Sequence, residues 1–205
     1  MAKIKLTKGE LKKQRDALIQ YERYLPTLQL KKQQLQLEII YHINILTERK
    51  RAEEKKREAL KSWIVLMADP GVDISKWIKP KDVLTQVKNI AGVDIPVFTE
   101  ARFEFAEYDL FSTPLWVDSG IDALRALASL KSEIAVIEEG VRILRRELRV
   151  TSQRVNLFEK VKIPQAREAI RLIKIYIGDQ MANAVGRSKI AKRKIKEMVF
   201  EEVAA

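Results

Sequence analysis

The chain has 205 residues, of which 33% are charged and 7% aromatic, and this balance favours an elongated helical protein over a compact globule. It contains no cysteine, which excludes disulfides and thiolate metal sites and favours a reducing compartment. No stretch approaches the ~20 apolar residues that span a bilayer, and the N-terminal residues lack the apolar core of a secretory signal. We therefore expect a soluble, cytoplasmic protein with no direct membrane insertion.

The net charge of +11 is unevenly distributed along the chain. Residues 1–68 carry +8, residues 69–122 carry −5 and residues 123–205 carry +8. Two basic arms therefore flank an acidic middle region.

A first long helix is predicted over residues 7–68. Thr7 and Glu10 have the spacing of a capping box, and the flanking leucines form a hydrophobic staple. From there a step of seven residues links Leu11, Leu18, Leu25, Ile39, Leu46, Leu60 and Met67. The step is interrupted twice, and residues 47–59 are nearly all charged. This leaky heptad predicts a coiled-coil seam that is weakest in the charged block.

One proline lies inside this predicted helix, in the stretch YLPTLQLKK, Tyr24–Lys32. An interior proline removes a helical hydrogen bond and clashes with the carbonyl four residues before it, so it ends or kinks a helix. Two interpretations follow: Pro26 kinks the first helix, or it begins a fresh helix after a short break. Pro164 would kink the second helix in the same way.

A β-hairpin is predicted at about residues 83–105. Val83–Ile90 and Val97–Phe105 are short and rich in β-branched or aromatic residues, and Gly92 and Pro96 between them are turn makers. A two-stranded hairpin is marginal alone in water, so it should lean on a helix or on a partner.

A second long helix is predicted over residues 119–200, where Ser119 and Asp122 again have capping-box spacing. Its heptad is cleaner, because nine of ten successive seam positions over 127–158 are apolar, with Thr151 the exception. The same frame continues at Ala169, Leu172 and Tyr176. A seven-residue period implies a left-handed supercoil.

Helices of this length cannot bury their apolar stripes within themselves, so the economical solution folds them onto each other. We predict a single elongated domain over residues 1–205, dominated by α-helix: a long antiparallel two-helix left-handed coiled coil with a short β-hairpin region in the middle of the chain. The hairpin belongs to a connecting region over residues 69–118, and both basic termini would lie together at the far end.

The sequence carries no pattern typical of catalysis. It lacks the P-loop pattern Gly-x-x-x-x-Gly-Lys-Ser/Thr, and its glycines near the C-terminus do not match a dinucleotide fingerprint. The single histidine, His42, lies on the first seam, where a packed seam residue is a simpler interpretation than a ligand or general base. Carboxylates interleave with Lys and Arg as on a solvated helix face. We expect no catalytic residue, no metal and no cofactor.

Two sets of residues are candidate interaction sites. The basic set comprises Lys8, Lys12, Lys13, Arg15, Arg187, Lys189, Lys192 and Arg193. Because no aromatic residue for base stacking lies beside it, we expect no nucleic acid there, and favour an acidic protein cavity or a solvated helix end. The aromatic set, which either forms an interface patch or packs the hairpin onto the coiled coil, comprises Phe98, Phe103, Phe105, Tyr108, Phe111 and Trp116.

These residues together resemble the D subunit of V-type and A-type rotary ATPases (ATP synthases), over nearly the whole chain. The most specific match is KLTKGELKKQRDALIQYERYLPTLQLKKQQLQLE, Lys5–Glu38. Supporting matches are AGVDIPVF, Ala91–Phe98, and KIPQAREAIRLIKIYI, Lys162–Ile177. The resemblance implies a non-catalytic central rotor shaft whose basic termini lie inside the catalytic hexamer of A and B subunits. Its middle region would face the F subunit and the funnel-shaped C (or d) subunit that seats the shaft on the membrane rotor ring.

The resemblance further implies a place in the cytoplasm, peripheral to the membrane, and a role in coupling ATP hydrolysis or synthesis to ring rotation and proton or sodium transport. Pro26 and Pro164 would then bend the shaft end, which would present different faces to the surrounding subunits as a cam does. The alternative is a non-motor coiled-coil adaptor or scaffold that binds an anionic partner. An adaptor predicts a homodimer, whereas a shaft predicts a monomer that pairs with a small globular subunit.

Overall fold

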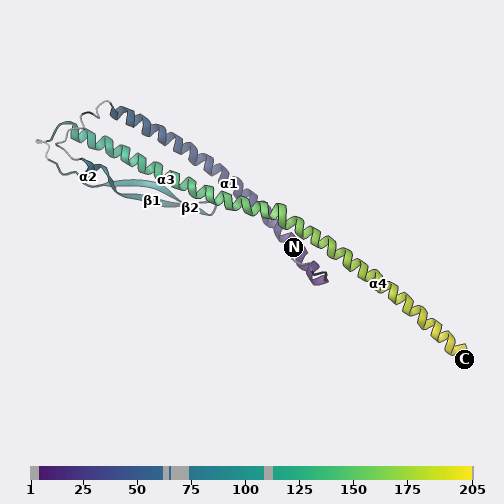
Figure 1. Cartoon of the computed structure of the whole chain (residues 1–205). Helices are drawn as coiled ribbons and strands as arrows, with labels where there is room; N and C mark the ends of the chain where they lie inside the picture. Colours follow the sequence, from purple (N-terminus) through teal and green to yellow (C-terminus); the bar gives the residue numbers. More distant parts are fainter. Residues whose placement is uncertain (1–4, 62–64, 66–73, 109–112, 205) are drawn as a thin grey trace. The chain divides into compact units, whose positions relative to one another are not determined.

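The computed structural model describes residues 5–61, 65, 74–108 and 113–204, with side chains described up to residue 199. Long helices hold most of these residues, and a two-stranded sheet lies between them in the chain (Figure 1). The elements in order are α1 (Lys8–Lys61), α2 (Ser75–Ile78), β1 (Pro80–Ile90), β2 (Val93–Phe103), α3 (Trp116–Leu157), a π-helical turn (Phe158–Lys162) and α4 (Ile163–Ala204).

Helix α1 begins where the capping signals predict. The backbone N–H of Glu10 donates to Thr7 Oγ1 at 3.3 Å, while the Glu10 carboxylate accepts from Gln14 Nε2 at 2.9 Å instead of returning to the cap. The helix then runs to Lys61 without interruption through Pro26, so no fresh helix begins there. The predicted residues beyond Lys61, which include Met67, lie outside the described residues apart from residue 65.

The chain packs as two compact units, one of Met1–Gln29 with Gln153–Ala205 and one of Leu30–Ser152. In the second unit three ion pairs join α1 to α3. They are Lys31 with Glu147 at 3.0 Å, Arg49 with Glu133 at 2.8 Å and Lys50 with Glu138 at 2.5 Å. Because the α3 partners of residues 49 and 50 precede the partner of residue 31, the two helices run antiparallel. This arrangement confirms the predicted helical hairpin, with a two-stranded antiparallel sheet in the middle of the chain.

The β-hairpin turns over two residues only. Ala91 and Gly92 have φ values of 51° and 74°, as a type I′ turn requires. Asn89 supports the turn, because its Oδ1 accepts from the Gly92 N–H at 3.1 Å and its Nδ2 donates to Asp94 Oδ1 at 2.6 Å. The prediction that Pro96 makes the turn is wrong: Pro96 lies inside β2, opposite Val87. A two-stranded sheet has only edge strands, where a residue without an N–H is tolerated.

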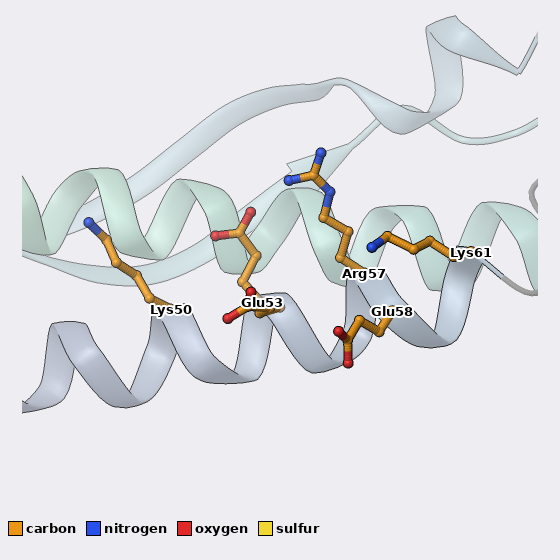
Figure 2. A pocket seen from close by; sticks show the side chains of 6 residues that line it. Lys50, Glu53, Arg57, Glu58 and Lys61 are labelled. Atoms are coloured by element: carbon orange, nitrogen blue, oxygen red, sulfur yellow. The ribbon is translucent and has the colours of Figure 1, made fainter.

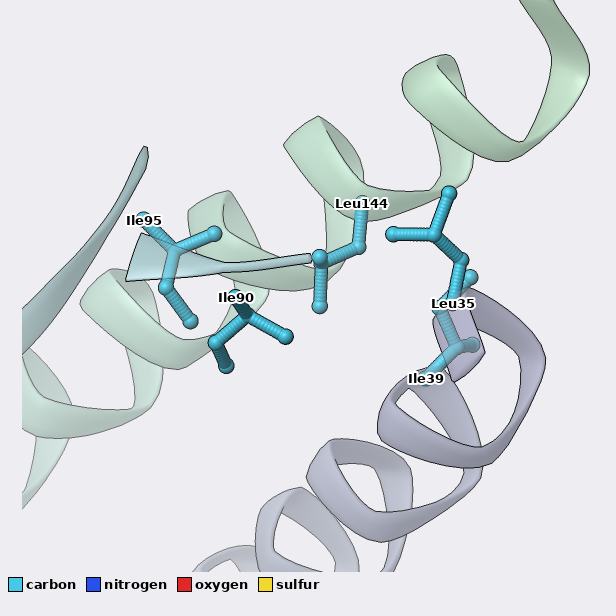
Figure 3. Close-up of a cluster of buried hydrophobic side chains, with 5 residues drawn as sticks. All are labelled: Leu35, Ile39, Ile90, Ile95 and Leu144. Carbon is cyan, nitrogen blue, oxygen red and sulfur yellow. The ribbon is translucent and has the colours of Figure 1, made fainter. Parts of the chain in front are cut away.

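The turn end of the hairpin packs against both long helices. Leu35 and Ile39 of α1, Ile90 and Ile95 of the hairpin and Leu144 of α3 form one buried cluster (Figure 3). Leu35 and Leu144 are completely buried. The hairpin therefore leans on the helices, as expected from the marginal stability of an isolated hairpin.

Gly140 lies on the buried side of α3 facing β2. A Cβ at this position would lie 3.8 Å from the Pro96 carbonyl oxygen and 3.9 Å from Ile95 Cβ, which is ordinary van der Waals contact. Gly140→Ala is therefore expected to raise the free energy of unfolding by about 0.5–1 kcal/mol, since alanine costs less backbone entropy in a helix. Urea unfolding measures this change. Gly140→Leu is the control: its longer side chain would overpack the contact and lower stability, and a loss with alanine as well would contradict the geometry.

The heptad positions of the buried residues shift at the π-helical turn between α3 and α4. The backbone N–H of Ile163 donates to the Phe158 carbonyl five residues earlier, which inserts one extra residue into the helix. Beyond this turn the buried row is Ile163, Ala166, Ala169, Ile170 and Ile173. The prediction for Leu172 and Tyr176 is therefore wrong, because they are 40% and 39% exposed, whereas the prediction for Ala169 is confirmed.

Candidate functional site

The unit that contains both termini pairs the first part of α1 with the start of α4. The Tyr21 and Phe158 rings stack with centroids 5.4 Å apart, and Arg167 donates to the Glu22 carboxylate at 2.8 Å. The buried row of α4 ends at Ile173, followed by half-buried Ile177. The two helices therefore pack against each other up to about Ile177.

Helix α4 continues past this pairing as a fully exposed segment, Gly178–Val199. Every side chain in the segment is exposed, including the predicted Arg187, Lys189, Lys192 and Arg193. Apolar side chains recur along it at Met181, Ala184, Ala191, Ile195 and Met198. A helix with an apolar row and no covering surface is marginal in water, so this segment is suited to a partner that surrounds it.

The basic residues of the first arm lie on α1, which is the other helix of the same unit. Their side chains are exposed at Lys8, Lys12, Lys13 and Arg15. Both basic sets therefore belong to the unit that holds the termini, but α4 extends beyond the residues that pack on α1. The prediction that they contact a surrounding hexamer stays a prediction.

Both prolines lie in this unit, and both are exposed. Pro26 is inside α1, where the next residue, Thr27, donates its hydroxyl to the Tyr24 carbonyl at 2.8 Å. Pro164 is the second residue after the π-helical turn, within the first turn of α4. Because a proline ring pushes away the carbonyl four residues before it, a helix opens on the proline side and bends toward the opposite face. At both positions the opposite face is the one that packs on the partner helix.

The aromatic set of the middle region divides into packed and exposed residues. Phe98, Phe103, Tyr108 and Trp116 are half-buried, whereas Phe105 is 87% exposed. Phe111 lies outside the described residues. Both interpretations of this set therefore stay predictions, and Phe105 is the described member whose side chain is most exposed.

Arg125 of α3 organises this region, and sequence analysis did not single it out. Its Nε donates to the Trp77 carbonyl at 2.9 Å and its Nη2 to the Glu104 carbonyl at 2.6 Å. Its guanidinium also lies 5.7 Å from the centre of the Phe103 ring. One side chain thus joins α2, the end of β2 and α3. The sequence gives no signal for this role, because Arg125 is one of many arginines on a basic helix.

Trp77 and Tyr108 complete the same cluster. Their ring centroids lie 5.4 Å apart, and the Tyr108 hydroxyl donates to the Asp118 carboxylate. This hydrogen bond to Asp118 raises the pKa of Tyr108 above its ordinary value. The hydrogen bond ties Tyr108 to the first turn of α3, where Asp118 lies.

His42 lies half-buried on the seam of α1, close to the hairpin. Its ring meets that of Tyr41 edge-on at 5.6 Å, and its Nε2 is buried without a hydrogen-bond partner among the described residues. Burial lowers the pKa of His42, with a smaller opposing effect from Glu38 and a smaller reinforcing effect from Lys88. The neutral imidazole is therefore the form that the folded chain prefers.

A pH dependence of stability follows from His42. Below about pH 6.5 the unfolded chain binds a proton at His42 before the folded chain does, so the free energy of unfolding falls as the pH drops through this range and levels off below the folded-state pKa. Urea unfolding of the natural chain and of His42→Gln between pH 5 and 7.5 measures it. The carboxylates are common to both chains, so the difference isolates His42, and parallel curves would contradict the assignment.

The charged block of α1 forms a solvated face. A shallow hollow along it is lined by side chains of both charge signs (Figure 2): Lys50, Glu53, Glu54, Arg57, Glu58 and Lys61. Each exposed ion pair from this block to α3 contributes only about 0–1 kcal/mol, so the block adds little to the stability of the helix pairing. Among the described residues, no group of three or more His, Cys, Asp or Glu is placed to hold a metal ion. In that same part of the chain, no helix is long and apolar enough to cross a membrane.

Comparisons with known proteins agree on one family. The family profile of the ATP synthase D subunit matches residues 10–193. The chain is 47% identical over 192 residues to the V-type ATP synthase D subunit of Borreliella burgdorferi, covering 94% of this chain and 95% of that protein. It is 36% identical over 206 residues to the protein of the same name from Chlamydia caviae, covering 100% and 99%.

Proposed function

The chain belongs to the ATP synthase D-subunit family, and from this we propose that it is the central stalk, or rotor shaft, of a V-type rotary ATPase. The observation that carries the proposal is the sequence relationship over almost the whole chain, at 47% identity. The antiparallel pairing of α1 with α3 supports it, because a shaft that transmits torque needs two long helices packed against each other. The chain itself is not catalytic in this proposal.

The shaft couples two motions. ATP hydrolysis in the hexamer of A and B subunits moves the unit that contains both termini through successive contacts, and the paired helices carry the torque to the middle region. The middle region passes it, with the F subunit and the funnel-shaped C (or d) subunit, to the membrane ring that transports protons or sodium ions. Synthesis runs the same steps in reverse. The protein is then cytoplasmic and peripheral to the membrane.

The exposed segment of α4 supports a terminal contact with the hexamer. Its apolar row and its basic residues are all uncovered in the isolated chain, and a surrounding sleeve with acidic and apolar side chains would cover both. The lysines and Arg15 at the start of α1 are exposed as well, and such a sleeve could also contact them.

Mild-detergent purification of this chain from its native membranes, followed by mass spectrometry, tests the proposal. We expect two large nucleotide-binding subunits in equal, several-fold excess over this chain. The alternative, a coiled-coil adaptor for an anionic partner, predicts a self-dimer without nucleotide-binding subunits. That result would overturn the rotor assignment.

Pro26→Ala tests the proposed bend of the shaft end. Alanine restores a backbone N–H within α1 and removes the ring clash, so the free energy of unfolding is expected to rise by about 1–3 kcal/mol. The straightened helix is expected to lower ATP-driven rotation several-fold, measured in the assembled complex. Thr27→Ala, at the next position of α1, is the matched control and should leave rotation unchanged. Unchanged rotation and unchanged shaft curvature with Pro26→Ala would refute the cam.

A further inference from the structure

Arg125 binds two backbone carbonyls that their own secondary structure does not pair. The Trp77 carbonyl, 2.9 Å from Nε, lies in the four-residue helix α2, and the last four carbonyls of a helix have no helical donor. The Glu104 carbonyl, 2.6 Å from Nη2, lies beyond Phe103, the last paired residue of β2. One half-buried guanidinium therefore supplies a donor to both carbonyls.

The two carbonyls lie at the same end of the hairpin. Pro80, the first residue of β1, pairs with Phe103, the last residue of β2, so this is the open end, opposite the turn. Trp77 shortly precedes Pro80 in the chain, and Glu104 directly follows Phe103. The guanidinium also lies 5.7 Å from the centre of the Phe103 ring. Arg125 thus holds the open end of the hairpin on α3.

The turn end of the hairpin is held on α3 at a different place. Ile90 and Ile95 pack there with Leu144 in the buried cluster. The distance along α3 from Arg125 to Leu144 is about 28 Å, at ~1.5 Å per residue. The hairpin therefore has two attachments to α3: an apolar one near its turn and a polar one at its open end.

The covalent connection does not fix the open end by itself. Residues 104–115 join β2 to α3, and a connection of this length spans up to about 40 Å when it is extended. Within it, the Tyr108 hydroxyl donates to Asp118, and the Tyr108 ring lies 5.4 Å from that of Trp77 between centroids. Non-covalent contacts therefore decide where the open end lies, and Arg125 makes those that reach both α2 and the end of β2.

We propose that Arg125 is a positioning residue for torque transfer, and that its forked guanidinium makes α2 and the open end of the hairpin turn together with α3. The inference rests on the proposed function, in which the paired helices pass rotation to the middle region. Arginine suits this role because its planar guanidinium holds five N–H donors in a fixed fork and stays charged. A lysine ammonium keeps the charge but lacks the fork.

Arg125→Lys in the assembled membrane complex tests the proposal. ATP hydrolysis is measured together with ATP-driven uptake of protons or sodium ions into sealed membrane vesicles. We expect hydrolysis to change less than about twofold and the ions transported per ATP to fall about fivefold or more, since hydrogen bonds from a charged donor are among the stronger side-chain contacts.

Arg142→Lys is the matched control for this experiment. Arg142 lies on the same helix, but its guanidinium pairs with Glu139 of α3 itself, at 2.7 Å, and joins no other element through that bond. It should leave the number of ions transported per ATP unchanged. If Arg125→Lys lowers hydrolysis and transport in equal proportion, or lowers neither, the proposed role in torque transfer is overturned.

Fluorescence of Trp77 tests the clamp in the isolated full-length chain. The chain has three tryptophans, so Trp63→Phe and Trp116→Phe leave Trp77 as the reporter. We expect Arg125→Lys to raise acrylamide quenching of Trp77 about twofold, because loss of a local contact opens that region before the rest of the fold. Circular dichroism should stay unchanged, and Arg142→Lys should leave the quenching unchanged. Unaltered quenching with Arg125→Lys would show that Arg125 does not hold α2 in place.

The two proposals fail differently. If nucleotide-binding subunits are absent from the complex purified with the natural chain, the rotor assignment fails, and the role of Arg125 in torque transfer fails with it. If they are present and the Arg125→Lys complex transports as many ions per ATP as the natural one, the rotor assignment stands and only the role of Arg125 is wrong.

Discussion

A chain that ends at Ile177 is expected to keep its melting temperature within about 2 °C and to lose coupling between ATP hydrolysis and ion transport. Gly178–Val199 is exposed throughout, so its removal uncovers no apolar surface and costs little stability. The same removal deletes the apolar row and the terminal basic residues proposed to meet the catalytic hexamer. We expect ATP-driven transport to fall about tenfold or more, because the contacts through which the hexamer would turn the shaft are then weakened.

The measurement combines thermal unfolding of the isolated chain with ATP-driven transport by the assembled complex. A full-length chain with Arg187, Lys189, Lys192 and Arg193 changed to Gln is the control that separates charge from helix length. If that chain behaves like the shortened one, the basic residues carry the contact; if it behaves like the natural chain, the apolar row carries it. Full transport by the shortened chain would show that the end of α4 has no part in coupling.

Leu144→Ala is expected to lower the free energy of unfolding by about 3–5 kcal/mol. Leu144 is completely buried and forms one cluster with Leu35 and Ile39 of α1 and with Ile90 and Ile95 of the hairpin. Its loss leaves a cavity where three elements meet, and the long helices on either side limit how far the cluster can collapse.

Urea unfolding followed by circular dichroism measures this effect. Leu157→Ala is the matched control, because Leu157 lies on α3 but is 44% exposed, and it should cost less than about 1 kcal/mol. Similar losses for both variants would mean that the cluster does not anchor the hairpin to the helices.

The elements that are determined by residues close together in the sequence could be predicted from the sequence. The start of α1 follows from Thr7, whose hydroxyl caps the Glu10 N–H. The burial of Ile39, Ile134 and Leu144 follows from heptad spacing, since residues three or four apart share one face of a helix. The hairpin followed from β-branched and aromatic runs around Gly92, although its turn proved to be shorter than expected.

The seam could not be followed past Phe158 by counting. One hydrogen bond, from the Ile163 N–H to the Phe158 carbonyl, inserts a residue and rotates everything after it, so that Ile173 is buried and Leu172 is not. A heptad period counted along the chain assumes that every backbone N–H donates to the carbonyl four residues earlier, as in a regular α-helix. Pro164 marks the place where that assumption fails, because it has no N–H to donate.

The sequence by itself therefore determined the long helices, the hairpin and the family, because these depend on local periodicity, capping and matching segments. Only the tertiary structure decided which residues work together across the chain. Arg125 reaches the Trp77 carbonyl 48 residues away and the Glu104 carbonyl 21 residues away, and no local pattern predicts either bond. Likewise, α1 is apolar on two sides, and the packing of the hairpin on Leu35 and Ile39 decides that Leu37 and Ile40 face outward.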